Sequence, residues 1–156
     1  PKDALKKLEQ PESELSIALW VSLKKHRGVS SLVRHDYEFD VFLDLDGFVY
    51  GGIFLGTENI FRITRTIEPL PLNHWAFICC VFKKGKEELF INGVKMKTAS
   101  HQETQPGPRF KNPLTIGFSP KHKQPAEGSI DDIRIYNRAL PAEQVKALYD
   151  WEKSKK

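Results

Sequence analysis

The feature that most constrains the fold is an alternation of apolar and polar residues with a period of two. Residues 15–24 read "LSIALWVSLK", and Ile17, Leu19, Val21 and Leu23 recur at every second position. Residues spaced by two lie on the same face of a β-strand, so this segment predicts a strand with one buried face.

Similar segments follow along the chain, separated by turn-forming residues. Asp46-Gly47 and Asn92-Gly93 are typical of two-residue hairpin turns. The segment "WAFICCVF" is apolar on both faces and predicts a central, fully covered strand. The predicted strands are residues 15–24, 29–35, 38–45, 48–54, 60–67, 75–82, 87–91, 94–98, 113–118 and 129–136.

One helix is predicted near the end of the sequence. Pro141 suits its first turn, Glu143 favours its N-terminus, and Val145, Leu148 and Tyr149 line one side. Residues 2–9 could add one short helical turn. About ten strands and one terminal helix in 156 residues predict an all-β, antiparallel two-sheet β-sandwich or jelly roll with a short C-terminal helix.

Charge and composition narrow the function classes. The net charge is +4, and the lysines form short clusters at predicted turns and at the end of the sequence. This indicates a solvated rim, with an acidic ligand as the alternative. No nucleic-acid module is readable, and the longest apolar run is far shorter than the ~20 residues of a membrane span. Cys79 and Cys80 are neighbours on a strand, so they point to opposite faces and are predicted to be apolar fillers.

Four segments, in this order, resemble one family. "LSIALWVSL" resembles an early strand often written F-T-h-S-A-W-V (h, hydrophobic), and "HWAFICCVF" resembles a W-x-H-V-A-h-V strand. "ELFINGVKM" resembles an L-Y-h-N-G hairpin. "PLTIGF" with "AEGSIDDIRIYNRALPAEQVKALY" resembles a closing L-x-I-G … G-x-I-D-D-V-R-I-Y-N-R-A-L signature. Together they are similar to the laminin-G-like, concanavalin A-like jelly rolls.

This resemblance implies a non-catalytic binding module for a polysaccharide or other glycan, often with a calcium ion, in a large bacterial surface or secreted protein. It implies a lead-in at residues 1–14, a domain at 15–152 and a basic tail at 153–156. The sequence begins with Pro1, so we expect a piece of a longer polypeptide, located extracellularly, in the periplasm or on the cell surface. An adhesion module that binds protein partners is the first alternative.

The segment "GSIDDIRIY" could hold the calcium ion. Ile130, Ile133 and Ile135 look core-facing, but the step from 130 to 133 breaks the alternation, and a β-bulge at Asp131-Asp132 would restore it. Two adjacent carboxylates suit a hard cation. In the alternative interpretation, one Asp pairs with a nearby arginine and the other caps backbone. The family's usual F-D-G strand, which contributes to the calcium site, is missing.

A polysaccharide hydrolase or lyase is the second alternative. Glucanases of this broader fold carry E-x-D-x-x-E on one strand. Glu38 and Asp40 match the first two positions, but the third position is Leu43. The residue needed for acid/base catalysis is therefore missing, and we expect no enzymatic activity.

The hairpin around Asp46-Gly47 contains the main candidate binding site. If these two residues form the turn, Leu45 faces Phe48, and the core side carries Phe39, Val41, Leu43, Tyr50, Gly52 and Phe54. The other face then carries Asp40, Phe42 and Asp44, with Phe42 across from Gly51. An aromatic ring beside carboxylates can stack on a pyranose and accept its hydroxyl hydrogens. In the alternative interpretation, Phe42 is simply covered by a loop.

Two long polar loops, residues 101–112 and 119–127, provide a further candidate surface. Loops on a rigid scaffold often carry recognition residues. The residues considered there for ligand binding are Arg109, Phe110, Lys121, His122 and Lys123.

Overall fold

The computed structural model describes residues 14–26, 28–36, 38–55, 60–102, 113–120, 123 and 125–156. It confirms the predicted antiparallel sandwich. The strands are β1 (Glu14–Lys25), β2 (Ser30–His35), β3 (Phe39–Leu43), β4 (Val49–Leu55), β5 (Ile60–Arg65), β6 (Trp75–Lys83), β7 (Lys86–Ile91), β8 (Val94–Ser100), β9 (Leu114–Ile116) and β10 (Glu127–Tyr136). They are followed by helix α2 (Ala142–Glu152) and the 3-10 turn η1 (Lys153–Lys155).

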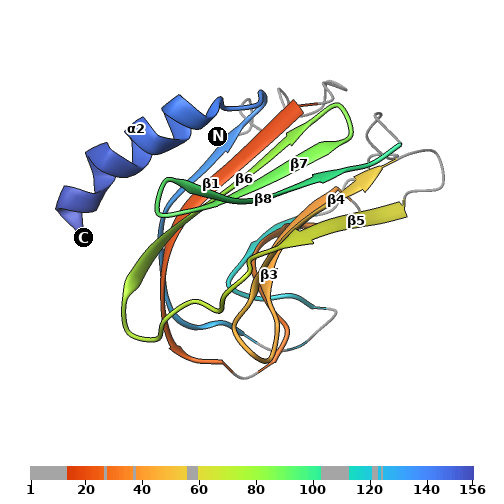
Figure 1. Cartoon of the computed structure of the whole chain (residues 1–156). Coiled ribbons are helices and arrows are strands. Elements are labelled where there is room, and N and C mark those ends of the chain that lie inside the picture. The colour runs from red at the N-terminus through yellow and green to blue at the C-terminus, as the bar shows by residue number, and fades with distance from the viewer. Residues whose placement is uncertain are drawn as a thin grey trace.

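The strands form two five-stranded sheets that face each other (Figure 1). Sheet A has the order β10-β1-β6-β7-β8, and sheet B has the order β5-β4-β3-β2-β9. Helix α2 lies on the side of sheet A that points away from sheet B (Figure 1). The molecule therefore has three layers, and each sheet presents an inner and an outer face.

The main core fills the space between the sheets. From β1 it receives Ile17, Leu19, Val21 and Leu23, the four residues whose spacing predicted a buried face. From the other sheet it receives, among others, Leu32, Phe39, Val41 and Leu43. Burial of this apolar surface supplies the dominant favourable contribution to folding.

A second cluster lies between sheet A and α2. It contains Trp20, Phe77, Cys79 and Val145, and the ring of Tyr149 stacks on Trp20 at 5.7 Å. Strand β6 contributes to both clusters, since Cys80 belongs to the main core and Cys79 to the second. Both cysteines are free thiols. The central, fully covered strand predicted at residues 75–82 is thus confirmed.

The predicted β-bulge in β10 is confirmed. The register along β1 steps from Ala18 opposite Arg134 to Trp20 opposite Asp131, so one extra residue lies on β10. Asp132 has a φ of 48°, in the left-handed region that residues with a Cβ seldom adopt. The bulge brings Ile130, Ile133 and Ile135 to positions where they pack against the main core.

The two predicted hairpin turns have different outcomes. At Asn92-Gly93 both φ angles are positive and Ile91 faces Val94, which is the two-residue turn expected. At Asp46-Gly47 only Gly47 has a positive φ, and the first facing pair is Leu43 with Val49. The two-residue turn predicted there is wrong, because the connection spans residues 44–48.

This longer turn moves β4 by one residue relative to β3. Tyr50 faces Phe42, and Gly51, not Gly52, faces Val41. The predicted core positions of Tyr50 and Phe54 are therefore wrong, and so is the predicted pairing of Phe42 with Gly51. Gly51 belongs to the inner face, where an added Cβ would lie 2.8 Å from the sulfur of Cys80. Leu45, also predicted in the core, is 66% exposed.

The predicted C-terminal helix is confirmed as α2, with Pro141 as its N-cap and Val145 buried. The helical turn predicted at residues 2–9 lies outside the described residues. Within the described ranges, no helix is long and apolar enough to cross a membrane.

Candidate functional site

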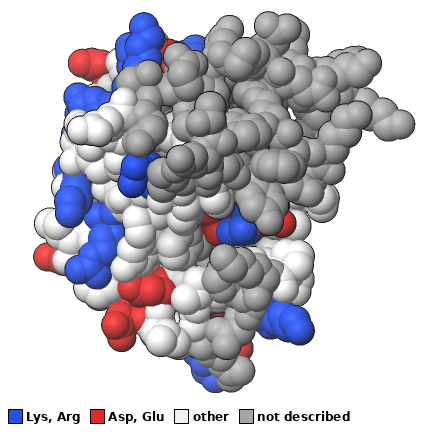
Figure 2. Space-filling model, turned by 90° about the vertical axis from the view of Figure 1, so that its right-hand side faces the viewer, with Lys and Arg blue, Asp and Glu red and all other residues white. Residues whose placement is uncertain are grey.

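The outer face of sheet B carries a row of four half-buried aromatic rings, Tyr50, Phe42, Phe61 and Phe54, which we call the aromatic strip. Phe42 stacks on Tyr50 with ring centroids 4.8 Å apart and ring planes 10° apart. Phe42 is 6.4 Å from Phe61, which in turn is 4.5 Å from Phe54. Figure 2 shows the side of the molecule that faces right in Figure 1. Lys and Arg side chains follow its left margin, further charged side chains lie near the centre and at the lower right, and uncharged residues cover much of the described surface between them.

The strip depends on Gly52 in β4. Gly52 faces Ile63 of β5, and the ring of Phe61 lies directly over its backbone. An added Cβ would lie 2.3 Å from the Phe61 ring, too close for any side chain. The glycine therefore lets the Phe61 ring lie close to the sheet, between Phe42 and Phe54.

Next to the strip, Asp40 is almost fully buried, with 2% of the residue exposed. One carboxylate oxygen, Oδ2, accepts a hydrogen bond from Ser31 Oγ at 3.1 Å and is ion-paired with Arg34. Burial raises the pKa of Asp40 to about 6, and Arg34 offsets part of that rise. The guanidinium of Arg34 is also paired with Asp36, so it connects the two carboxylates.

The second carboxylate oxygen of Asp40, Oδ1, is buried as well. That oxygen accepts no hydrogen bond from any described residue. A buried carboxylate oxygen without a partner is unusual. Asp40 lies on the same sheet face as Phe42, two residues before it on strand β3.

Asp44, predicted to bind ligand, makes three hydrogen bonds within its own hairpin. Its Oδ1 accepts hydrogen bonds from the backbone amides of Asp46 and Phe48, both at 3.0 Å. Its Oδ2 accepts one from the hydroxyl of Tyr50 at 3.1 Å. The Asp44 carboxylate thus stabilises the turn through its backbone amides, and it orients the Tyr50 ring at the end of the strip.

The structure brings together only part of the predicted binding set. Asp40 and Phe42 share the outer face, and Asp44 reaches it through Tyr50. Arg109, Phe110, Lys121 and His122 lie outside the described residues. Lys123 is described, exposed, and has a positive φ of 54°.

The two carboxylates predicted to hold calcium, Asp131 and Asp132, both contact the ammonium of Lys156. The Lys156–Asp132 distance is 2.9 Å. Calcium takes six to eight oxygen ligands. In the described part of the chain, no group of three or more His, Cys, Asp or Glu side chains could hold a metal ion. Two carboxylates with an ammonium between them therefore fit calcium poorly.

Sequence reasoning missed Tyr50, Phe61 and Phe54 as the other rings of the strip, and it missed Arg34 as the partner of Asp40. The signal was present in β5, where "IFRITR" alternates Phe61, Ile63 and Arg65 on one side. Aligning this alternation with Gly52 would have placed an aromatic ring over a glycine. The error in the Asp46-Gly47 register concealed that match.

The glucanase-like carboxylate set is incomplete in the structure as well. Glu38 pairs with His35, with Oε2 and Nδ1 3.4 Å apart. Asp40 is buried against Arg34, and Leu43, at the third position of the motif, lies in the main core. A retaining glycosidase needs two carboxyl groups that flank the substrate from one cleft.

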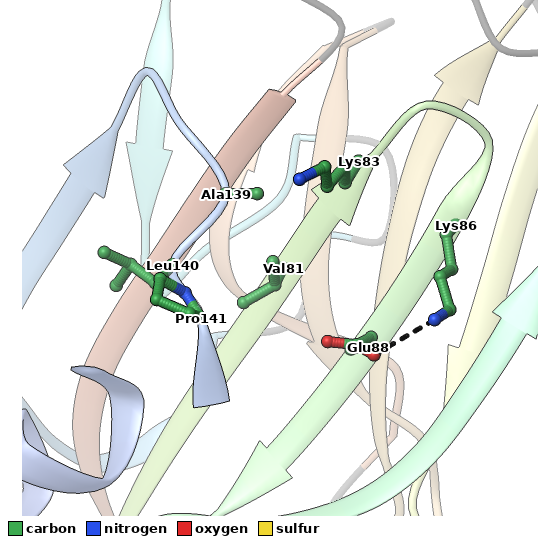
Figure 3. A pocket seen from close by; sticks show the side chains of 7 residues that line it. All are labelled: Val81, Lys83, Lys86, Glu88, Ala139, Leu140 and Pro141. Atoms are coloured by element: carbon green, nitrogen blue, oxygen red, sulfur yellow. Dashed lines mark ion pairs between the residues drawn. The ribbon is translucent and has the colours of Figure 1, made fainter. Parts of the chain in front are cut away.

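A pocket of about 380 Å³ opens on the outer side of sheet A, beside the start of α2. Figure 3 shows Leu140 and Pro141 on one side of it, Lys86 and Glu88 on the other, and Val81 between them. Glu88 is paired with Lys86 at 3.6 Å and with Lys95 at 2.7 Å. No aromatic ring lines this pocket, so it lacks the stacking surface that the strip offers.

Comparisons with known proteins agree with the fold. No curated protein matches the sequence. Among solved structures, a candidate carbohydrate-binding protein from Bacteroides ovatus is 14% identical, with a TM-score of 0.73. The match covers 88% of this chain but 41% of that protein, so the chain spans less than half of its length.

Two similar structures contain sugars. The carbohydrate-binding module of a Ruminococcus gnavus sialidase, with α2,3-sialyllactose, is 12% identical over 92% of this chain and 86% of its own, with a TM-score of 0.70. Domain 4 of an extracellular arabinanase from Geobacillus stearothermophilus, in complex with arabinotriose, is 21% identical, with a TM-score of 0.68. This match covers 90% of this chain and 68% of that one. At these identities the likeness establishes the fold.

The family is established separately from these structures. The model of the "Concanavalin A-like lectin/glucanases superfamily" matches residues 4–146, which is most of the chain. This match includes both sheets and the first half of α2. The chain therefore belongs to the concanavalin A-like lectin/glucanase superfamily.

Proposed function

We propose that this chain is a non-catalytic carbohydrate-binding module that holds a glycan against the outer face of sheet B. The observation that carries the proposal is the aromatic strip, four rings in a row on one sheet face. Aromatic rings bind the apolar C–H faces of sugars, and ligand sites combine such surfaces with a few placed polar groups. Similar structures hold sialyllactose and arabinotriose, which supports a sugar over another ligand.

The polar groups near the strip fit this use. The Tyr50 hydroxyl lies at one end, oriented by Asp44. Arg65, opposite Tyr50 on β5, is exposed, and its guanidinium lies 4.7 Å from the centre of the Phe48 ring. A sugar lying along the strip could form hydrogen bonds with these two side chains. Asp40 and Arg34 then act as positioning residues beneath it.

The setting we propose is a larger bacterial surface or secreted protein in which this module provides attachment. The structural relatives include a domain of an extracellular arabinanase and a module of a sialidase. A protein-binding adhesion module would use the same fold without glycan affinity. A glycan array, probed with and without calcium, separates the two, because arrays that remain blank under both conditions would contradict the carbohydrate proposal.

Truncating Phe42 tests where the glycan binds. Phe42 lies in the row between Tyr50 and Phe61, so Phe42→Ala interrupts the strip without touching the core. Truncating an aromatic hot spot typically costs about 2 kcal/mol, so we expect affinity for any array-positive glycan to fall about tenfold or more. Titration calorimetry with that glycan would measure the change.

The matched control is Trp151→Ala, which removes an exposed ring from α2 on the opposite side of the molecule. We expect this variant to bind as the wild type does. Thermal melts of both variants confirm that each is folded. Unchanged affinity in folded Phe42→Ala would move the site away from the strip.

A further inference from the structure

The ammonium of Lys156 sits in a cage built from three strands of sheet A. The carboxylates of Asp131 and Asp132 both contact it. The ring of Trp75 is 5.2 Å from its Nζ, and the ring of Trp20 is 5.8 Å away. Only 8% of the Lys156 side chain is exposed. Two anionic groups and two indole rings thus surround one positive charge.

The bulge in β10 makes this convergence possible. In a regular strand, neighbouring side chains point to opposite faces, so Asp131 and Asp132 could not reach the same ammonium. The positive φ of Asp132 turns its carboxylate to the side of Asp131. The backbone amide of Asp132 then donates a hydrogen bond to Asp131 Oδ1 at 2.8 Å. Such backbone strain often marks a site with a binding role.

The indole rings determine what kind of cation suits the cage. Trp20 is buried and fixed, since its Nε1 donates a hydrogen bond to Glu152 at 2.8 Å. An indole face within about 6 Å attracts an organic ammonium, and aromatic cages of this kind recognise alkylated ammonium groups. An indole offers no lone pair to calcium, which takes oxygen ligands. The side chains of the cage therefore favour an organic ammonium over a metal ion.

We propose that Asp131, Asp132, Trp20 and Trp75 form a binding site for primary alkylammonium groups, which Lys156 fills in this structure. An external ammonium enters when Lys156 swings out, and Asp131, whose side chain is 56% exposed, provides the open side. Because Lys156 is tethered, it competes at a high effective concentration. The site lies on sheet A, so it is independent of the glycan proposal for sheet B.

The test titrates the Lys156→Ala variant with n-butylammonium chloride and follows tryptophan fluorescence, with sodium chloride at equal ionic strength as the reference. We expect a saturable change in Lys156→Ala, and an apparent affinity at least about tenfold weaker in the wild type, where Lys156 competes. The double variant Lys156→Ala/Asp132→Asn should lose the response. Lys156→Ser, which empties the same cage, serves as a second variant, and circular dichroism checks that each is folded.

Three results would overturn the proposal. The first is the absence of a saturable response to butylammonium in both folded Lys156 variants. The second is an equal response with and without Asp132, because the carboxylates would then have no part in binding. The third is saturation by calcium chloride at lower concentration than by butylammonium, which would assign Asp131 and Asp132 to a metal ion instead.

Discussion

Replacing Glu87 with Gln is expected to raise the free energy of unfolding by a few kcal/mol at pH 8 to 9, and by much less near pH 5. Glu87 lies on the inner face of β7, opposite Phe82 of the main core, and is 1% exposed. Burial raises the pKa of Glu87 to about 8, and the backbone amide of Ile53 makes a smaller opposing contribution. The carboxyl group is therefore protonated in the folded protein across most of the physiological range.

The direction of this pH dependence follows from the number of protons that Glu87 binds in the folded and in the unfolded state. In the unfolded chain the carboxyl has an ordinary pKa of 4.5, so between pH 4.5 and 8 the folded state binds more protons than the unfolded state. Stability must therefore fall as pH rises through this interval, by about 1.4 kcal/mol per unit at most, and level off above it. Glutamine has the same shape and no charge, so it removes this loss.

Urea unfolding of the wild type and Glu87→Gln at several pH values measures the difference. Contributions from groups that do not interact with Glu87 are the same in both proteins and cancel in this difference. His101 is a contact of Glu87, with its Nε2 3.3 Å from the carboxylate. Glu88→Gln is the matched control, because it makes the same substitution at the neighbouring position, where the carboxylate pairs with surface lysines outside the core. A difference between wild type and Glu87→Gln that stays constant from pH 5 to 9 would show that Glu87 is ionised in the fold.

The sheets could be predicted from the sequence because the alternation of apolar residues reports burial directly. The four core residues of β1 and the doubly buried strand β6 are in their predicted places. The bulge at Asp131-Asp132 was also predictable, since only an extra residue restores the phase of the three isoleucines around it. These patterns need no knowledge of distant contacts.

The candidate site could not be predicted fully because its register depends on one side chain. Asn92-Gly93 and Asp46-Gly47 carry the same turn signal, but only the first forms the two-residue turn. At the second, the carboxylate of Asp44 binds two backbone amides, and the amide of Leu70 donates a hydrogen bond to the carbonyl of Gly47 at 2.9 Å. This last contact comes from a distant segment, so local sequence could not reveal the five-residue turn.

Replacing Glu152 with Ala is expected to destabilise the protein by about 2 to 3 kcal/mol, because it leaves the buried indole N–H of Trp20 without an acceptor and removes one of the two carboxylates near Arg134. Glu152, at the end of α2, is fully buried, with 0% exposed. Its Oε2 accepts the hydrogen bond from Trp20 Nε1 at 2.8 Å, and its Oε1 is ion-paired with Arg134 of β10. It therefore joins the helix to two strands of sheet A.

Glu152→Gln separates the two contributions. The amide oxygen can still accept the hydrogen bond from Trp20, but the charge that pairs with Arg134 is lost, so an intermediate stability is expected. In a double-mutant cycle, Trp20→Phe removes the indole donor. The double variant should then lose less unfolding free energy than the sum of the losses in Trp20→Phe and Glu152→Ala. Denaturant unfolding of the four proteins measures the coupling. Strict additivity of Trp20→Phe and Glu152→Ala would mean that the Trp20–Glu152 hydrogen bond does not hold α2 on sheet A, and that the apolar contacts of Val145 and Tyr149 suffice.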